Sequence, residues 1–473
     1  MRRQLSRYHP RYIRSLVYML QASEYHVRDF LAWHARTSDF RYVEKRKHLV
    51  FTAKALVLLV FGWTLSMLAV AAAIIVSVYF TSAWKYALSA AILYELPLFA
   101  ALGVVSALFL ERVVQTPVEA VIVSRARAKL ARHKAIKIAI AGSFGKTSMR
   151  EILRTVLAEE KRVAAPGGSQ NTPLAISRFI RKLSGDEEVL IFELGEYYPD
   201  DVHILCELVQ PDIGIITGVN EAHLEKFKTL EATTDTVFEL ADCMGEKPIY
   251  VNGENEAVYG RAALDHILYT REGAGSWHAE DARTGLEGTS FVLRGNGSRI
   301  SVVSKLLGLH QVGPLVCAAD VATRLGIAPD DIQRGLSHTK AFEHRLEPRV
   351  EGGVTILDDS YNGNPDGVAA VIAFLSSQKA RRWYVTPGLV EMGDQKDDIH
   401  RQIGKQIAEA GIEHVVLIKN SVTPFIERGL EEANYRGVVH WFNDALQAYG
   451  ALPHMTVSGD VVLLQNDWPD QYA

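Results

Sequence analysis

The chain has 473 residues, of which 48% are hydrophobic and 22% charged, and its formal net charge is −4 at pH 7. Because this length exceeds what one hydrophobic core normally supports, we expect two or three domains. The slightly acidic balance argues against a general nucleic-acid-binding protein.

The first 50 residues are rich in arginine and aromatic side chains and carry an apolar stripe at roughly helical spacing. Its members are Ile13, Leu16, Val17, Leu20, Val27, Phe30 and Leu31. Basic residues lie between them, which is typical of an amphipathic cytoplasmic segment. Two arrangements stay open: the segment lies on the inner membrane surface, or it packs as a helix on a catalytic domain.

Two long apolar runs follow this segment. Residues 55–80 contain no charge, and residues 86–110 contain one, Glu95, followed by Pro97. Each run is long enough to cross a bilayer, and the first starts too far into the chain to be a signal peptide. We therefore expect residues 51–112 to form a transmembrane hairpin rather than two buried helices of a soluble core.

Basic residues flank this hairpin on both sides. They are Arg41, Lys45, Arg46 and Lys47 before it, and Arg125, Arg127, Lys129, Arg132 and Lys134 after it. The connecting turn, residues 81–85, carries one lysine, so both chain ends are expected in the cytoplasm. We therefore expect residues 113–134 to form a basic linker helix and the catalytic domains to face the cytoplasm at the inner (cytoplasmic) membrane.

From residue 135 onward, strand and helix patterns alternate. Strands are expected at 136–141, 189–194 and 213–219, helices at 149–157, 200–209 and 314–325, and short β elements within 273–304. This alternation is typical of a doubly wound α/β domain with a parallel sheet. We assign residues 135–348 to a central domain of this kind.

A second α/β unit, residues 349–473, follows a boundary near 347–353. Strands are expected at 354–357, 382–386, 414–418 and 461–464, and helices at 366–376 and 400–410, with one more helix before the last strand. The predicted fold class is therefore α/β, with a P-loop central domain and a Rossmann-like C-terminal domain behind a two-helix transmembrane hairpin.

The three cysteines are Cys206, Cys243 and Cys317. Their number is odd and their spacing is wide, so they indicate neither a disulfide framework nor a zinc site. We expect small buried side chains in a reducing compartment.

A glycine-rich loop separates the first cytosolic strand from its helix. Gly142 and Gly145 allow backbone N–H groups to point at an anion at the helix N-terminus. Lys146 supplies a positive charge for the β/γ-phosphates, and the Thr147 hydroxyl can ligate Mg²⁺. A plain glycine turn before an amphipathic helix would show the same residue pattern. The strand before the loop and the helix after it favour a nucleotide-binding site instead.

Polar residues follow the next two apolar strands. Glu193 ends one strand, where a Mg²⁺ ligand beside a phosphate loop belongs, and His223 follows the other within residues 220–225. His223 could be a metal ligand or a general base. A polar turn at residues 358–366 could hold a ribose or an adenine edge. Solvated caps and turns remain the simpler interpretation of each motif alone.

In this order and spacing the motifs resemble the Mur ligases, ATP-dependent amide-forming enzymes of cell-wall precursor synthesis. The matching segments are 142–148, 192–195, 220–225, 342–347, 357–366 and 387–393, with His400. The resemblance covers residue 135 to the C-terminus. Within the family it is closest to the branch that adds D-Ala-D-Ala to a UDP-linked muramoyl tripeptide.

The resemblance implies that a substrate carboxylate takes the γ-phosphate of ATP, and that an amine then displaces phosphate to form an amide. Lys146, Glu193 and His223 would carry catalysis, with Mg²⁺ held by Thr147, Glu193 and His223. The implied nucleotide-binding residues are Gly142, Ser143, Gly145, Lys146, Thr147, Ser148, Arg345, Asp359 and Asn362. Closure of the C-terminal domain would complete the site.

Three departures from the family pattern matter. Many members carry a carbamylated lysine after the His223 motif, whereas here Val237 stands at that position. Asp235 or Glu239 could substitute, or a second metal could be held in another way. The family's G-x-H-N-x-x-N adenine motif appears as residues 308–314 with both asparagines replaced. We expect the hairpin to stand in the place of the family's usual UDP-sugar-binding domain.

The leading hypothesis is a membrane-tethered ligase that joins an amino acid or short peptide to a nucleotide- or lipid-linked cell-wall precursor. A poly-γ-glutamate-type amide ligase is a second enzyme hypothesis. A non-catalytic scaffold or a membrane P-loop regulator, such as a polysaccharide-export tyrosine kinase, is a third. Those kinases carry a large extracytoplasmic domain between their spans, whereas here the turn is residues 81–85.

Overall fold

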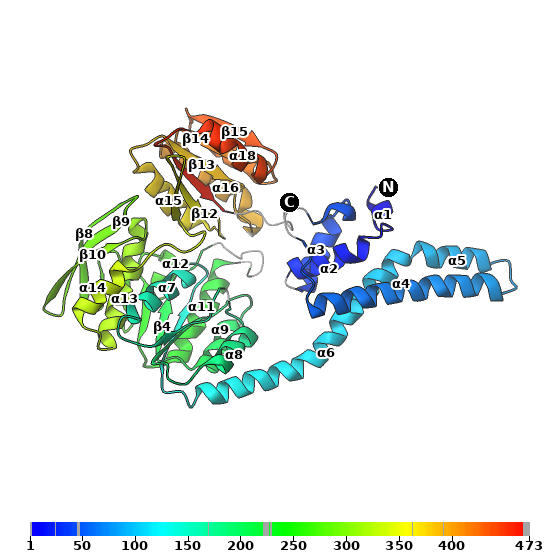
Figure 1. Ribbon diagram of the computed structural model, residues 1–473, viewed down its shortest axis with the longest axis horizontal. Coiled ribbons are helices and arrows are strands. Elements are labelled where there is room, and N and C mark those ends of the chain that lie inside the picture. Colours follow the sequence, from blue (N-terminus) through cyan, green and yellow to red (C-terminus); the bar gives the residue numbers. More distant parts are fainter. Residues whose placement is uncertain are drawn as a thin grey trace. The chain divides into compact units, whose positions relative to one another are not determined.

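The computed structural model describes residues 2–23, 25–44, 48–168, 170–220, 227, 229–361, 363–390 and 392–466. The chain forms two compact units (Figure 1), one running to Val121 and the other from Ile122 to Asp467. Each unit has its own hydrophobic core, so each is described separately.

The first unit is entirely helical in its described regular elements. These are α1 (Arg2–Ser6), α2 (Tyr12–Ala22), α3 (Val27–Arg36), η1 (Phe40–Tyr42), α4 (Ala53–Tyr79), α5 (Lys85–Tyr94) and the start of α6 (Leu96–Leu130). Helices α4 and α5 lie side by side and antiparallel (Figure 1). By length and composition alone, α4 and α6 could each cross a bilayer.

The second predicted span is divided in the structure. Helix α5 ends at Tyr94, and α6 starts at Leu96 directly before Pro97. Proline has no N–H to donate and its ring collides with the preceding turn, which explains the break. Helix α6 then continues to Leu130 without ending at the predicted boundary after residue 112.

The apolar stripe of the first 50 residues forms the core of this unit. Ile13 and Leu16 of α2 and Phe30 of α3 are buried against Leu58 of α4 and Val104 of α6. Within the described residues, the partner of the stripe is therefore the helical hairpin. Leu31, predicted to belong to the stripe, is 55% exposed. Lys45, Arg46 and Lys47 of the predicted basic flank lie outside the described residues.

The central domain is built on a ten-stranded sheet. Its strands lie in the order β10-β9-β8-β7-β6-β5-β4-β1-β3-β2. The strands that pair in parallel are β1 (Ile136–Ala141), β2 (Val163–Ala164), β3 (Val189–Glu193), β4 (Ile213–Ile216), β5 (Ile249–Asn252) and β6 (Ile267–Thr270). The antiparallel part is β7 (Gly273–Ala274), β8 (Trp277–Gly285), β9 (Gly288–Gly295) and β10 (Ser298–Ser304).

Residues 138–141 of strand β1 are buried on both faces, which explains why this part of the strand is apolar throughout. Ile138 and Ile140 face one core, and Ala139 and Ala141 face the other. The first core is covered by α7 (Lys146–Leu157), α13 (Val312–Arg324) and α14 (Pro329–Ser337). The second is covered by α8 (Pro173–Lys182), α9 (Asp201–Val209), α11 (Leu230–Met244) and the end of α6.

The C-terminal domain has a six-stranded sheet in the order β11-β12-β16-β13-β14-β15. Its elements are β11 (Glu347–Glu351), β12 (Val354–Asp359), α15 (Pro365–Ser376), β13 (Arg382–Thr386), α16 (Lys396–Glu409), β14 (His414–Ile418), α17 (Thr423–Glu432), β15 (Val438–Phe442), α18 (Ala445–Met455) and β16 (Val461–Gln465). The predicted boundary at 347–353 is largely strand β11, hydrogen-bonded antiparallel to β12. The predicted α/β class is confirmed, and both sheets are mixed: parallel strands pair with one another, and antiparallel strands extend each sheet at one end.

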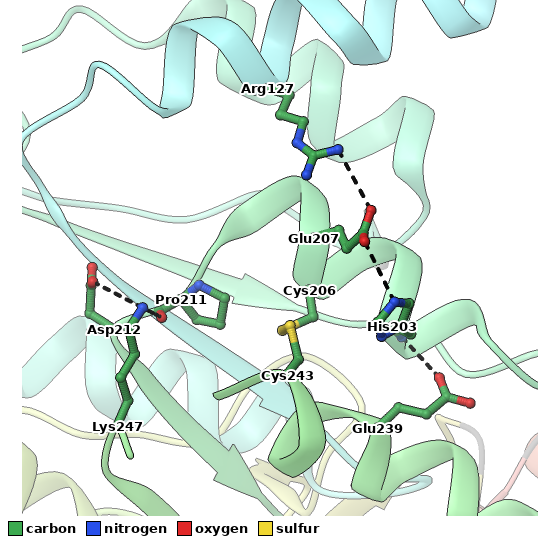
Figure 2. The surroundings of a disulfide bond; sticks show 9 residues. All are labelled: Arg127, His203, Cys206, Glu207, Pro211, Asp212, Glu239, Cys243 and Lys247. Atoms are coloured by element: carbon green, nitrogen blue, oxygen red, sulfur yellow. Dashed lines mark hydrogen bonds and ion pairs between the residues drawn. A yellow bond between two sulfur atoms is a disulfide. The ribbon is translucent and has the colours of Figure 1, made fainter. Parts of the chain in front are cut away.

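The expectation of three unpaired cysteines is wrong. Cys206 of α9 and Cys243 of α11 form a disulfide, with Cα atoms 6.6 Å apart and a sequence separation of 37 (Figure 2). Helices α9 and α11 pack on the same face of the sheet, which brings residues distant in sequence together. Cys317 is buried and free, as expected.

Candidate active site

The glycine-rich loop lies between the end of β1 and the start of α7. Gly142 has φ 143° and Gly145 has φ 78°, values that favour glycine. A Cβ atom on Gly142 would lie 2.2 Å from the Thr217 hydroxyl, so the loop also needs glycine for space. Thr217 donates to the Phe144 carbonyl. The residues after β4 therefore hold the loop in shape.

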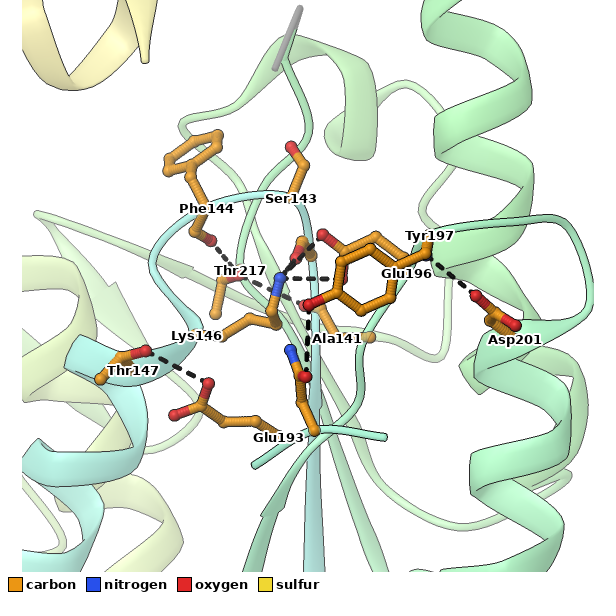
Figure 3. Close-up of polar contacts among 12 residues, drawn as sticks. Ala141, Ser143, Phe144, Lys146, Thr147, Glu193, Glu196, Tyr197, Asp201 and Thr217 are labelled. Atoms are coloured by element: carbon orange, nitrogen blue, oxygen red, sulfur yellow. Dashed lines mark hydrogen bonds and ion pairs between the residues drawn. The ribbon is translucent and has the colours of Figure 1, made fainter. Parts of the chain in front are cut away.

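Lys146 reaches across this loop to a carboxylate that the sequence motifs did not single out. Its Nζ lies 2.8 Å from both Oε atoms of Glu196 and also donates to the Gly142 carbonyl (Figure 3). The side chains are 12% and 2% exposed, so this is a buried ion pair. Glu196 directly follows the matched segment 192–195. An acidic residue so close to the end of a strand could have been predicted from the sequence to lie near the loop.

Glu193 lies beside the first turn of α7, as the sequence predicts. Strand β3 pairs with β1 so that Glu193 is opposite Ile140, which brings the carboxylate to the loop. Its Oε2 accepts a 3.2 Å hydrogen bond from the Thr147 hydroxyl, and its Oε1 lies 2.7 Å from Arg150 Nη1. Burial raises the pKa of Glu193, while Arg150 opposes the rise.

The segment after β4 links the loop to the C-terminal domain. The Asn220 backbone N–H donates to Ser143 Oγ at 3.1 Å, and Asn220 Nδ2 donates to Asn364 Oδ1 at 2.6 Å. Asn364 also caps the N-terminus of α15. His223 lies outside the described residues, so its predicted role stays a prediction.

Two of the predicted ribose or adenine contacts, Arg345 just before β11 and Asp359 at the end of β12, lie near each other. The Arg345 guanidinium stands 4.6 Å from the centre of the Tyr361 ring. Asp359 accepts hydrogen bonds from the Leu346 N–H at 3.1 Å and from Gln465 Nε2 at 2.8 Å. Burial lowers the pKa of Arg345 and raises that of Asp359. Asn362 lies outside the described residues.

The residues around the glycine loop and the pair Arg345 and Asp359 influence each other electrostatically. Glu193 is one of the charges that act on the pKa of Arg345, and Arg345 is one of those that act on Glu193. Gly142, Ser143, Gly145, Lys146, Thr147, Ser148 and Glu193 lie around the phosphate loop. The predicted nucleotide-contacting arginine therefore lies within electrostatic reach of the loop.

The proposed substitutes for the family's modified lysine have other partners. Glu239 accepts hydrogen bonds from the backbone N–H groups of Asp200 and His203 at 2.8 and 2.9 Å. Asp235 pairs with Arg261. Val237, at the aligned position, is fully buried.

The donor set at the loop fits magnesium. The Thr147 hydroxyl and the Glu193 carboxylate are hard oxygen ligands, and Mg²⁺ bound with substrate phosphates commonly takes one or two protein carboxylates. Among the described residues, no group of three or more His, Cys, Asp or Glu side chains forms a metal cage.

Comparison with known proteins agrees with this geometry. Residues 140–322 match the Mur ligase middle domain, and residues 344–465 match the glutamate ligase domain of Mur ligases. The chain is 24% identical to the UDP-N-acetylmuramoyl-tripeptide–D-alanyl-D-alanine ligase of Bacillus subtilis over 69% of this chain and 72% of that protein. It is 28% identical to the enzyme of the same name from Mycobacterium tuberculosis, over 59% of this chain and 58% of that protein.

Solved structures show the same fold. MurF from Acinetobacter baumannii superposes with a TM-score of 0.67 and 21% identity, covering 75% of this chain and 78% of that one. MurF from Thermotoga maritima in complex with ADP superposes with a TM-score of 0.65 and 22% identity, covering 74% of this chain and 80% of that one. The two matched domains follow each other along the chain and together take up most of the second unit. The chain belongs to the Mur ligase family.

Proposed function

We propose that this protein is an ATP-dependent ligase that forms an amide bond on a carboxylate of a cell-wall precursor through an acyl phosphate. The observation that carries the proposal is the arrangement of Lys146, Thr147 and Glu193 around a glycine loop at the carboxyl edge of a parallel sheet. Membership of the Mur ligase family supports this chemistry. The similarity to D-alanyl-D-alanine ligases supports a dipeptide of that kind as the amine donor.

The residues of the loop have separate tasks in this reaction. The loop N–H groups bind phosphate oxygens, and Lys146 stabilises negative charge on the γ-phosphoryl group while it is transferred. Thr147 and Glu193 would hold Mg²⁺, with His223 proposed for a second ion. Magnesium, when bound, neutralises phosphate charge and aligns the phosphoryl group for attack.

Two bond exchanges follow from this arrangement. The precursor carboxylate attacks the γ-phosphorus, and the bond to ADP breaks. The amine then attacks the acyl carbon, the bond to phosphate breaks, and the amine loses a proton. Arg345 and Asp359, with Asn362, are proposed to contact the ribose or adenine, so that closure of the C-terminal domain excludes water from the acyl phosphate.

We also propose that α4 and α6 tether the enzyme to the inner membrane. Helix α4 has 27 residues, so it is about 40 Å long and can span the hydrocarbon core. Large apolar side chains on its surface are exposed, among them Val60, Met67 and Ile74. Such a surface suits lipid. The acceptor would then be lipid-linked or UDP-linked at the cytoplasmic face.

The test uses the full chain in detergent and measures ADP formation that depends on both amine and acceptor. D-Ala-D-Ala, single amino acids and free glutamate are compared as amines, and muramoyl peptides as acceptors. Lys146→Ala should lower the rate by about a thousandfold, because a cation on the transferring phosphoryl group is worth at least that much. Lys182→Ala, at an exposed position, is the matched control. An unchanged rate in Lys146→Ala would remove the ligase assignment, and turnover with free glutamate alone would favour a poly-γ-glutamate-type enzyme.

A further inference from the structure

Glu196 lies next to the glycine loop, where nucleotide phosphates are proposed to bind. Both of its carboxylate oxygens lie 2.8 Å from Lys146 Nζ, the atom proposed to bind the β/γ-phosphates. The whole residue is 3% exposed. An ion pair this deeply buried is expensive to break, because separating it leaves a buried charge without a partner.

The backbone on both sides of Glu196 is held in place. The Gly195 N–H donates to the Asn171 carbonyl at 3.0 Å, and a Cβ on Gly195 would approach that carbonyl to 2.8 Å. The N–H groups of Tyr197 and Tyr198 both donate to Asp201 Oδ2, at 3.0 and 2.8 Å. The carboxylate is therefore presented to Lys146 by a fixed turn (Figure 3).

Arg150, the cation that pairs with Glu193, already has several partners. Arg150 contacts the Glu193 carboxylate at 2.7 Å, the Glu151 carboxylate at 2.8 Å and the Gly168 carbonyl at 2.8 Å. When phosphates take over Lys146, Arg150 is not free to neutralise Glu196. A buried carboxylate would then stand close to the nucleotide phosphates, and like charges at such a distance repel strongly.

We propose that Glu196 is a positioning residue that competes with nucleotide phosphates for Lys146 and thereby makes nucleotide binding depend on a divalent cation. Without a cation, the nucleotide must break the ion pair and tolerate the freed carboxylate. With a cation, the positive charge offsets both the phosphates and Glu196. The inference rests on the proposed function, since it assumes that Lys146 binds phosphates.

The test measures the dissociation constant of ADP for the full chain in EDTA and in excess Mg²⁺. Glu196→Gln keeps the shape and a hydrogen-bond acceptor but removes the charge. In EDTA the variant should bind ADP at least about tenfold tighter than the wild type, because the Glu196 carboxylate no longer competes with the ADP phosphates for Lys146. The ratio between the EDTA and Mg²⁺ constants should fall by the same factor. Glu160→Gln, an exposed glutamate one turn past α7, should behave like the wild type.

A second variant, Glu196→Ala, guards against an effect peculiar to glutamine. A purely structural role for Glu196 predicts weaker binding in both variants, together with a lower unfolding temperature. Unchanged or weaker ADP binding in EDTA by both variants would overturn the inference while the wild type still binds MgADP. Failure of the wild type and of every variant to bind ADP in either condition would overturn the proposed function and this inference together.

Discussion

His400 shows how a single ring can hold a loop in place. Its Nε2 accepts a 2.8 Å hydrogen bond from the Leu389 N–H, and its Nδ1 lies against the Lys396 carbonyl. The proton must therefore be on Nδ1, and the ring is neutral. Gly388, with φ 81°, allows the turn that brings Leu389 to the ring. The motif 387–393 with His400 thus has a structural role that can be tested by pH.

Lowering the pH should destabilise the protein through His400. Burial lowers its pKa below the ordinary value of 6.5. As the pH falls below that value, the unfolded chain takes up a proton that the folded chain resists, so the free energy of unfolding decreases. Thermal unfolding between pH 7.5 and 5 should show this loss, and His400→Gln should flatten it. His454→Gln, at an exposed position, should keep the wild-type slope, and equal slopes in all three proteins would contradict the prediction.

At the scale of elements, the close crossing of α4 and α6 depends on two glycines. A Cβ on Gly103 would lie 2.7 Å from the Phe61 carbonyl oxygen and 3.0 Å from the Gly62 Cα. A Cβ on Gly62 would lie 2.7 Å from Ile13 Cγ2 of α2. Because glycine has only a hydrogen atom in place of a side chain, the two helix backbones can approach closely at Gly62 and Gly103. Helix α2 packs against α4 at this crossing.

Gly103→Val should destabilise the first unit. The added methyl groups must push α4 away from α6, and overpacking of this kind costs about 1–3 kcal/mol. Thermal unfolding of the full chain in detergent should therefore begin at a lower temperature. Ser106→Val, on an exposed face of the same helix, is the matched control. Equal unfolding temperatures in the two variants would show that the crossing is not close.

The disulfide between α9 and α11 should stabilise the central domain. It closes a loop between positions 37 residues apart, for which the loss of chain entropy in the unfolded state gives about 4 kcal/mol. Dithiothreitol should lower the unfolding temperature of the wild type and leave that of Cys243→Ser unchanged. Cys317 remains in both proteins, so it cannot explain a difference. An identical response of both proteins to the reductant would contradict a native disulfide.

At the scale of the whole molecule, the exposed apolar surface of α4 should decide where the protein is found. The wild type should stay with membranes after extraction at alkaline pH. Met67→Arg combined with Ile74→Arg, at positions 65% and 57% exposed, should release it, because each charge costs a few kcal/mol in hydrocarbon. Val303→Arg with Val350→Arg, on exposed strand positions, should leave it bound. Release of the wild type itself would contradict the tether.

The sequence by itself determined the α/β class, the family and the place of the phosphate loop. These depend on local patterns, because Gly142, Gly145, Lys146 and Thr147 act within one turn of chain between a strand and a helix. The place of Glu193 near the loop could also be predicted from the sequence, because the ends of neighbouring parallel strands meet at one edge of a sheet. The roles of these residues remain proposals.

Tertiary structure alone decided which distant side chains meet. Glu196 reaches Lys146 because β3 lies beside β1, and Cys206 meets Cys243 because two helices pack on one sheet face. The apolar stripe around Leu16 packs on the helical hairpin, although its spacing suited a membrane surface equally well. Spacing along the chain reports which face of an element is apolar, but the element that covers this face is set by the packing of the whole fold.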